Sequence, residues 1–247
     1  MRDRAPAQPA AEATVVVAVH DLSHTYGQGH SAVTALNHVS FQAPAGTLVA
    51  ITGRSGSGKT TLLNLIGGLD TPTSGSILVK GREVTRLSEH ERTRLRRQDV
   101  AFVFQSFALL PTLSALENVT LALHIAGIPV AERTRRARAM LDLVGLAARL
   151  QHRPYELSGG EQERVAVARA LATGAVLILA DEPTGELDTA TGSEIIALLA
   201  QVVHTRQVTM LVATHDAAVV AAADQAYRLA DGNLRALEGT PAHAATP

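Results

Sequence analysis

A glycine-rich segment that joins a buried strand to a helix constrains this chain more than any other feature. The apolar run 47–52 predicts a strand, Thr60 to Ile66 predicts a helix, and Gly53 to Thr60 has the spacing G-x-x-x-x-G-K-[ST]. Glycines let backbone N–H groups close around phosphate oxygens, and the helix start adds a favourable dipole. A Gly/Ser-rich loop with a chance lysine is the alternative, and the flanking strand and helix argue against it. The sequence therefore predicts a phosphate-binding loop, or P-loop, in an α/β sheet.

The side chains of this loop suit a nucleotide with a bound metal ion. We expect Lys59 to neutralise the β- and γ-phosphates and Thr60 to supply its hydroxyl to Mg²⁺. The other positions expected to hold the nucleotide are Gly53, Ser55, Gly56, Ser57, Gly58 and Thr61.

Two acids follow a second apolar strand. The run Val176 to Ala180 ends in Asp181 and Glu182. Because ligands of open α/β sheets bind beyond the carboxyl ends of the strands, these acids belong in the ligand crevice. We expect Asp181 to hold the Mg²⁺ shell and Glu182 to act as general base toward the attacking water. An acidic strand-to-loop turn is the alternative, which is weakened by the P-loop upstream.

The length of 247 residues suits one large α/β domain, or a core with a helical insertion. Further strands are predicted at Val15–His20, Val39–Phe41, Ile77–Val79, Val100–Phe104 and Thr209–Ala213, with a turn at Tyr26–Gly29. Further helices are predicted at 88–97, 160–172 and 189–205, and a helical pattern from Pro111 to about Leu150 breaks at 127–129 and Gly145. We expect one domain over 14–238 with a helical insertion at about 106–151, a disordered leader at 1–13 and a flexible tail at 239–247.

Composition narrows the function classes. The 22 Lys and Arg residues against 23 acids give a net charge of −1 and no basic track for nucleic acid. Aromatic residues make up only 3%, so base-stacking platforms are scarce. The absence of cysteine excludes disulfides and thiolate metal sites. No apolar run approaches the ~18–20 residues of a membrane helix, and the N-terminus lacks the apolar region of a secretory signal, so the chain by itself is expected to be soluble.

A second glycine-rich turn, Leu157-Ser158-Gly159-Gly160-Glu161-Gln162, precedes another predicted helix without a second P-loop lysine. With the P-loop and the Asp181–Glu182 pair, it resembles the signature loop of the ATP-binding-cassette (ABC) ATPases, and the resemblance covers residues 15–236. It implies an α/β fold: a P-loop NTPase ABC cassette with a mostly parallel core sheet, an N-terminal antiparallel β part and an inserted α-helical subdomain.

The resemblance also implies a dimer. Ser158 and Gly160, with Gly159 and Glu161 of the same loop, would clamp the γ-phosphate of an ATP that the P-loop of a second copy holds. Two ATP molecules, each with Mg²⁺, would then lie in a homodimer that ATP closes and hydrolysis opens, a ligand-biased two-state switch.

Four further positions match family elements. Gln105 matches the Q-loop glutamine that senses Mg²⁺ and the transporter, and His215 matches the switch histidine at the γ-phosphate. Tyr26 matches the aromatic residue that stacks on adenine, and Gly185–Asp188 matches the D-loop, with Asp188 near the nucleotide. By themselves these residues have ordinary alternatives: a solvated loop glutamine, a structural histidine and a packing tyrosine.

The segment Arg96 to Val119 resembles the ATPases of lipoprotein-release and macrolide-export systems. Such an ATPase would work at the cytoplasmic face of the cell membrane, peripheral through an integral membrane permease, and without nucleic acid. Two residues depart from the pattern of these relatives: Glu186 replaces the usual Asn in the D-loop and adds a negative charge near the expected dimer seam, and Glu163 replaces the usual second Gln after the signature.

Two rival functions differ from transport. A mechanotransmission ATPase would signal through its membrane partner to cell-wall enzymes without moving a solute. A soluble ABC protein acting on nucleic acid or ribosomes would generally need two cassettes or a coiled-coil arm, and this chain has neither.

We expect the permease to dock on Ser106 to Asn118, which is too apolar for a solvated loop, although packing under the helical insertion is an alternative explanation.

Overall fold

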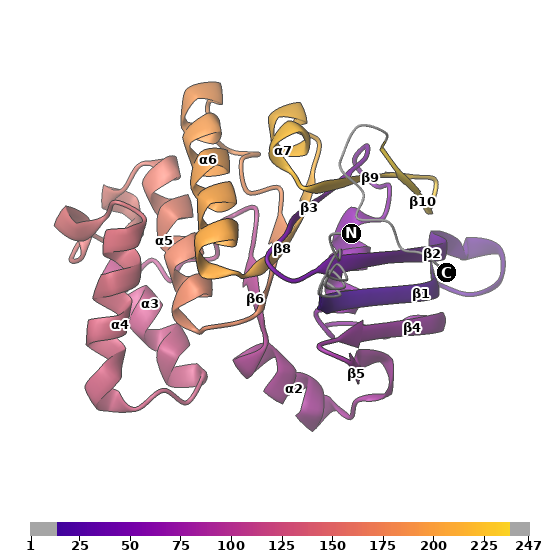
Figure 1. Ribbon diagram of the computed structural model, residues 1–247, viewed down its shortest axis with the longest axis horizontal. Helices are drawn as coiled ribbons and strands as arrows, with labels where there is room; N and C mark the ends of the chain where they lie inside the picture. The colour runs from indigo at the N-terminus through magenta and orange to yellow at the C-terminus, as the bar shows by residue number, and fades with distance from the viewer. Residues whose placement is uncertain (1–13, 238–247) are drawn as a thin grey trace, which may run out of the picture.

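Two β-sheets and the helices packed against them make up residues 14–237, the part of the chain that the computed structural model describes (Figure 1). The strands are β1 (Val15–Tyr26), β2 (Val33–Pro44), β3 (Leu48–Thr52), β4 (Ser74–Val79), β5 (Arg82–Glu83), β6 (Val100–Val103), β7 (Leu177–Asp181), β8 (Thr209–Thr214), β9 (Gln225–Ala230) and β10 (Asn233–Ala236). The helices are α1 (Lys59–Ile66), α2 (Glu89–Gln98), α3 (Ala115–Ile125), α4 (Val130–Leu143), α5 (Gly159–Ala172), α6 (Thr189–Arg206) and α7 (Ala217–Ala222). The predicted leader and tail, residues 1–13 and 239–247, lie outside the described residues.

The larger sheet has the strand order β10-β9-β3-β8-β7-β6, and its described strands are parallel except for the β9–β10 pair. Alternate residues of a strand face opposite sides, so each central strand contributes to two cores. On β3, Leu48 and Ala50 belong to the core shared with α3 to α7. Val49 and Ile51 belong to the core shared with α1 and the smaller sheet. Because both faces are covered, the interiors of the central strands are apolar, as their sequences predict, and polar residues stand at the strand ends.

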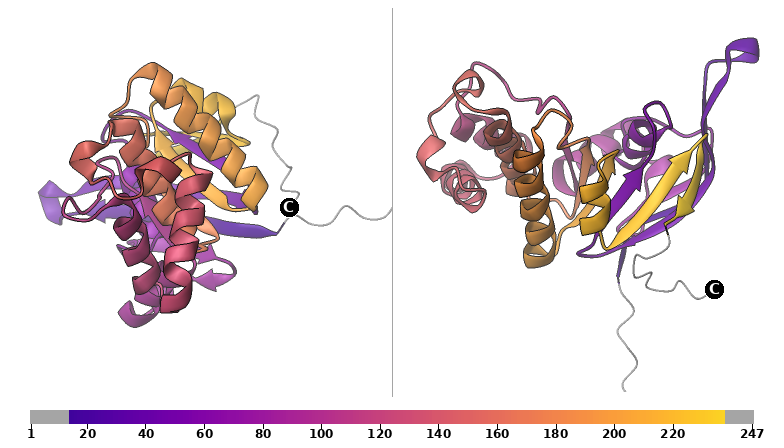
Figure 2. Two further views of the ribbon diagram at one scale, coloured as in Figure 1. Left: turned by 90° about the vertical axis from the view of Figure 1, so that its left-hand side faces the viewer. Right: turned by 90° about the horizontal axis from the view of Figure 1, so that it is seen from above.

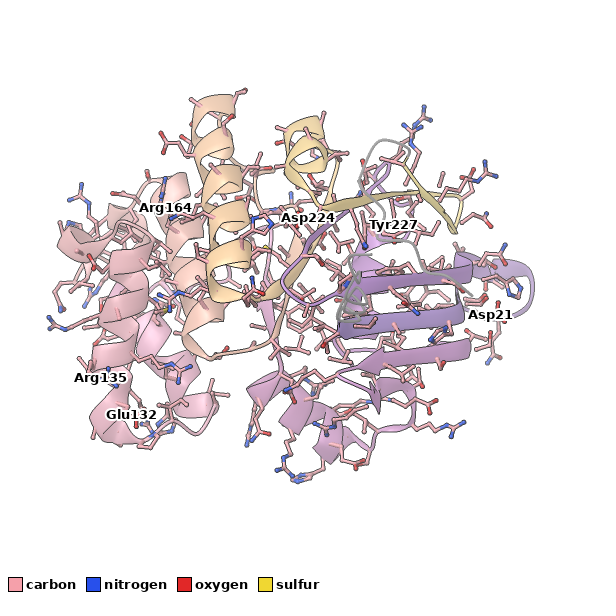
Figure 3. All side chains as sticks on the ribbon, viewed as in Figure 1. Asp21, Glu132, Arg135, Arg164, Asp224 and Tyr227 are labelled. Carbon is pink, nitrogen blue, oxygen red and sulfur yellow. The ribbon has the colours of Figure 1, made fainter. Side chains whose placement is uncertain are left out.

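The smaller sheet is antiparallel, with the order β2-β1-β4-β5. β1 and β2 have 12 residues each, so the strands predicted there are too short. Tyr26 pairs with Val33 as the last residue of β1, and the predicted turn therefore begins after it. Register shifts along β1 and β2 interrupt the alternation from which strand ends are predicted. The ring of Tyr227 on β9 (labelled in Figure 3) lies 5.4 Å, between centroids, from the ring of Phe41 on β2, and this contact joins the two sheets.

The helical insertion holds α3 and α4, on the side of the molecule away from the antiparallel sheet (Figures 1 and 2). The two predicted breaks are left-handed glycines, Gly127 after α3 and Gly145 after α4. Arg164 of α5 ties this part to the core, because its guanidinium donates to the carbonyl of Val144 (3.3 Å) and to Glu194 of α6 (2.9 Å; Figure 3). The predicted fold class, with its parallel core, antiparallel N-terminal part and inserted helices, is confirmed.

Three C-terminal elements, α7, β9 and β10, have no counterpart among the predicted elements. β9 pairs with β3, far away in the chain, and such pairing is set by tertiary context rather than by local propensity. Within residues 14–237, no helix combines the length and apolar character needed to cross a membrane.

Candidate active site

The P-loop connects β3 to α1 and passes between two backbone segments that lie in close contact with it. A Cβ on Gly53 would lie 2.3 Å from the carbonyl oxygen of Leu229 on β9, and a Cβ on Gly58 would lie 2.4 Å from that of Ala35 on β2. Gly58 also caps α1 in the left-handed conformation, with φ 102°. Glycine is therefore required at both positions, and strands from both sheets fix the path of the loop.

The tip of the loop is open and its interior is polar. Ser55 and Gly56 are exposed, whereas the hydroxyl of Ser57 is buried without a hydrogen-bond partner among the described residues. A cleft of about 820 Å³ opens beside the loop, lined on its far side by Arg228 and Asp231. An unpaired hydroxyl next to a cleft at the start of a helix suits a polyphosphate.

Lys59, the first residue of α1, lies inside the loop. Its ammonium donates to the carbonyls of Gly53 (2.8 Å) and Arg54 (3.3 Å) and lies 3.4 Å from a carboxylate oxygen of Glu182. The residue is 6% exposed. A buried ammonium held at the centre of a phosphate-binding loop is placed to neutralise a phosphate group.

Thr60 and Asp181 meet where α1 begins and β7 ends. The Thr60 hydroxyl donates a 2.7 Å hydrogen bond to Oδ2 of Asp181. Burial raises the pKa of Asp181 and the charge of Glu182 raises it further, while the Thr60 hydrogen bond and the charge of Lys59 oppose the rise. A cation here would favour the charged carboxylate.

No cluster of three or more His, Cys, Asp or Glu side chains within 14–237 could hold a metal unaided. The hydroxyl–carboxylate pair of Thr60 and Asp181 fits Mg²⁺, which keeps few protein ligands and takes phosphate oxygens for the rest.

Glu182 follows Asp181 in a strained backbone conformation, with φ 48°. Its N–H donates to the carbonyl of Ala213 on β8 (2.8 Å), which fixes the turn. One carboxylate oxygen faces Lys59, and the other lies 2.8 Å from Nδ1 of His215 and accepts the backbone N–H of His215 (3.2 Å). The predicted base and the predicted switch histidine are thus in direct contact.

Gln105 lies beside the same turn. It follows β6, whose Val103 pairs with Ala180 of β7, so both strands end at one edge of the sheet. A Cβ on Gly185 would lie 3.6 Å from the Gln105 amide nitrogen. The exposed Gln105 is therefore next to the Glu182 turn, as its predicted role requires.

Tyr26 and Thr61 meet on the other side of the P-loop. The phenol oxygen of Tyr26 lies 3.3 Å from Oγ1 of Thr61, the third residue of α1. Tyr26 is 44% exposed, so part of its ring is free for a planar ligand.

The signature turn begins α5. The Ser158 hydroxyl accepts the N–H of Glu161 (3.3 Å), and the Glu161 carboxylate accepts the N–H of Ser158 (2.9 Å), which is a capping box. A hydrogen bond from Arg149 lowers the pKa of Glu161 most, followed by the one from Ser158. Gly159 and Gly160 pack closely on Leu187 and Thr191, because a Cβ on Gly160 would lie 2.3 Å from the Thr191 methyl.

In the described chain no hydrogen bond joins residues 158–161 to residues 53–61. The signature turn is thus not bonded to the P-loop of its own chain.

Asp188 caps α6. Its carboxylate accepts the N–H groups of Ala190 and Thr191 (both 3.1 Å) and the Thr191 hydroxyl (2.6 Å). These bonds, the Thr191 hydroxyl first, lower the pKa of Asp188. Both oxygens are engaged in starting the helix that packs on the signature glycines, which is a structural role the sequence did not predict.

Several residues that shape the site belong to no sequence motif. The backbone oxygens of Leu229 and Ala35 shape the P-loop, and Thr184 donates to Asp216 (3.2 Å) beneath the Glu182 turn. Arg169 of α5 donates to the carbonyls of Phe107 and Ala108, both with left-handed φ, and so holds the segment after Gln105. These contacts depend on the assembled fold, and no local sequence signal indicates them.

Comparison with known proteins agrees with this geometry. A family model described as ABC transporter matches residues 36–185. The lipoprotein-releasing system ATP-binding protein LolD of Rhodopseudomonas palustris is 44% identical over 228 residues, which is 92% of this chain and 98% of that protein. The macrolide export ATP-binding/permease protein MacB of Brucella melitensis is 45% identical over 219 residues, which is 89% of this chain but 34% of MacB.

A solved structure has the same fold. The dimeric post-hydrolysis state of the ATP-binding cassette MJ0796, bound to ADP and Pi, superposes with a TM-score of 0.81 at 40% identity, over 90% of this chain and 99% of that one.

Proposed function

This chain belongs to the ABC transporter family of ATP-binding cassettes, and we propose that it is the ATPase subunit that powers a membrane permease of the lipoprotein-release or macrolide-export type. The observation that carries the proposal is the meeting of Lys59, Thr60, Asp181 and Glu182 at one edge of the parallel sheet. The reaction is hydrolysis of ATP to ADP and phosphate.

Each of these side chains has a task in that reaction. Lys59 and the loop N–H groups bind the β- and γ-phosphates. Mg²⁺, held by Thr60 and Asp181 with phosphate oxygens, would offset the charge of the phosphates. Glu182 accepts a proton from the attacking water, and His215 holds the second oxygen of Glu182 so that the carboxylate keeps its direction. Gln105, beside the same turn, reports the state of the site to the permease.

We infer that two copies share each nucleotide. The hydrogen bonds of the signature turn and the P-loop are separate within one chain, so the γ-phosphate contact of Ser158 and Gly160 comes from a second copy. The dimeric state of the related MJ0796 cassette supports this arrangement. Since the hydrolysed γ-phosphate is the shared link, its loss opens the dimer.

The permease is proposed to dock beside α3. A groove of about 590 Å³ lies between α2 and the end of α3, and a hollow of about 260 Å³ continues it toward Phe104 and Ala108. Phe104 and Ile125, which line the hollow, are 40% and 54% exposed, and Leu110, two residues after Ala108, is 46% exposed. An apolar surface of this kind commonly marks a protein partner. Docking there would hold the chain at the cytoplasmic face of the membrane, with no part for nucleic acid.

Not all of Ser106 to Asn118 belongs to this surface. Phe107 is buried and Leu109 packs against the helical core, so the alternative explanation holds for these two side chains. The Asn118 side chain is also buried, where it accepts the N–H of Leu110 (2.8 Å) and donates to the carbonyl of Leu113 (3.1 Å). The loop backbone is thus fixed while the Leu110 side chain is left outside.

The Glu182→Gln variant tests the function. It removes the base but keeps the groups that bind ATP, so turnover should fall by ~10²–10⁴-fold. In size-exclusion chromatography this variant should then form a stable dimer with ATP and should not form one with ADP. Adding Ser158→Arg to this variant should keep it monomeric, because the clamp is blocked. A Glu182→Gln protein that binds ATP but stays monomeric would contradict the two-copy site.

A further inference from the structure

A buried histidine lies behind Tyr26 on β1. His24 is 7% exposed, and neither Nδ1 nor Nε2 of its ring has a hydrogen-bond partner among the described residues. A buried polar group without hydrogen bonds costs free energy, so its presence needs an explanation other than filling space.

The histidine contacts the tyrosine directly. The two residues are two positions apart on β1, and their side chains meet on one side of the strand. Their rings meet edge to face at a centroid distance of 4.5 Å and an angle of 86°. This geometry is the one that aromatic pairs prefer.

A carboxylate also lies near the imidazole, beyond hydrogen-bond distance. Nε2 of His24 lies 3.7 Å from Oδ2 of Asp70, in the segment after α1. α1 begins at the P-loop, and its Thr61 approaches the phenol oxygen of Tyr26. The start of α1 therefore contacts Tyr26, and the segment after its end lies near His24.

Tyr26 needs such support because of its position. It is the last residue of β1, immediately before the turn to β2, and 44% of its surface is exposed. An unrestrained tyrosine side chain at a strand end samples several rotamers. Binding would then cost the free energy of restricting it to one of them. The Thr61 contact restrains the tip of the ring, and the His24 ring restrains its body.

We propose that His24 is a positioning residue for the base of the nucleotide: its ring holds the ring of Tyr26 so that the exposed face stacks on the purine. The inference rests on the proposed role of Tyr26 in nucleotide binding. It assigns no contact between His24 and the nucleotide itself.

The test compares a ligand with a base and a ligand without one. We would measure dissociation constants for Mg²⁺–ADP and Mg²⁺–pyrophosphate by calorimetry, since neither is hydrolysed by the site. His24→Leu and His24→Gln, which lack an aromatic ring, should bind ADP about two- to tenfold more weakly, in line with the loss of one aromatic pair. Pyrophosphate affinity should not change. His24→Phe keeps the ring and should bind ADP like the wild type.

Two further measurements separate positioning from general damage. The KM for ATP should rise by the same factor as the ADP dissociation constant while kcat stays the same. In a Tyr26→Ala background, which itself should weaken ADP binding by roughly five- to 160-fold, His24→Leu should have no further effect. Far-UV circular dichroism checks that each variant is folded, and the Gln variant serves if the Leu variant is not.

The outcomes distinguish the two hypotheses. If Tyr26→Ala weakens ADP binding and both His24→Leu and His24→Gln bind ADP normally, the positioning role is wrong and the stacking role stands. Equal losses for ADP and pyrophosphate, or additive losses with Tyr26→Ala, would also overturn it. If Tyr26→Ala binds ADP like the wild type, the stacking role fails and the inference fails with it.

Discussion

Glu163 should make this protein less stable as pH rises through neutrality. It lies in α5, two residues after Glu161, and is 0% exposed. Neither of its carboxylate oxygens has a hydrogen-bond partner within residues 14–237. Burial raises the pKa of Glu163 from 4.5 to about 8; the charge of Arg169 opposes the rise, and the charge of Glu186 in the D-loop adds to it.

The raised pKa fixes the sign of the effect. The folded protein holds the proton up to about pH 8, whereas the unfolded chain releases it near pH 4.5. The stability linked to this proton is therefore fully present below pH 4.5 and is lost progressively as pH rises through 8. At about 1.4 kcal/mol per pKa unit, the complete loss is at most roughly 5 kcal/mol, of which roughly 3 kcal/mol is lost by pH 7 and under roughly 1 kcal/mol by pH 5.

Glu163→Gln removes the titration and keeps the shape of the side chain. The amide resembles the protonated carboxyl group, so wild type and variant should have similar unfolding free energies near pH 5. At pH 7 the variant should be more stable by roughly 3 kcal/mol, and at pH 8 by somewhat more. Urea unfolding followed by circular dichroism at pH 5, 6, 7 and 8, without nucleotide, gives the free energies.

Glu132 supplies the control, because it is exposed on α4 (Figure 3). Glu132→Gln should leave the pH dependence of the unfolding free energy as in the wild type. If Glu163→Gln and wild type lose stability in parallel between pH 5 and 8, the Glu163 carboxyl group is not the buried, unpaired acid described above.

Two further predictions concern the site and the docking surface. Lys59→Ala should lower ATPase turnover at least ~10²-fold, because the cation offsetting the phosphates is lost; near-normal phosphate release would remove Lys59 from the mechanism. Leu110→Glu should leave the isolated subunit folded, since Asn118 and Arg169 hold the loop backbone, and should abolish co-purification with the permease. Normal assembly of that variant would locate the docking surface elsewhere.

The motifs of the phosphate site could be predicted because their signals are local. A strand, a glycine-rich turn and a helix follow each other directly at Gly53–Thr60, and Asp181 and Glu182 directly follow an apolar strand. Since parallel strands place their carboxyl ends at one edge, the meeting of these residues follows from the fold class.

The supporting contacts could not be predicted, because they join distant parts of the chain. Nothing near Gly53 indicates that Leu229 will press on it, and nothing near Tyr26 indicates that Asp70 will lie behind His24. The same holds for Glu163. The sequence shows an acid in place of a glutamine, but only the packing of α5 shows that the carboxyl group is buried without a partner.

If the proposed function is correct, the contact between Lys59 and Glu182 links the binding of ATP to its hydrolysis. Without nucleotide, the buried Lys59 ammonium is compensated by two carbonyls and by the Glu182 carboxylate 3.4 Å away. A γ-phosphate in the loop would take over this compensation, because it carries more charge than a single carboxylate. Glu182 would then keep only its contact with His215, so its other oxygen becomes free to accept a hydrogen bond from water. On the proposed function, the base would thus be released only when the phosphate it acts on has arrived, which would couple the start of hydrolysis to ATP binding.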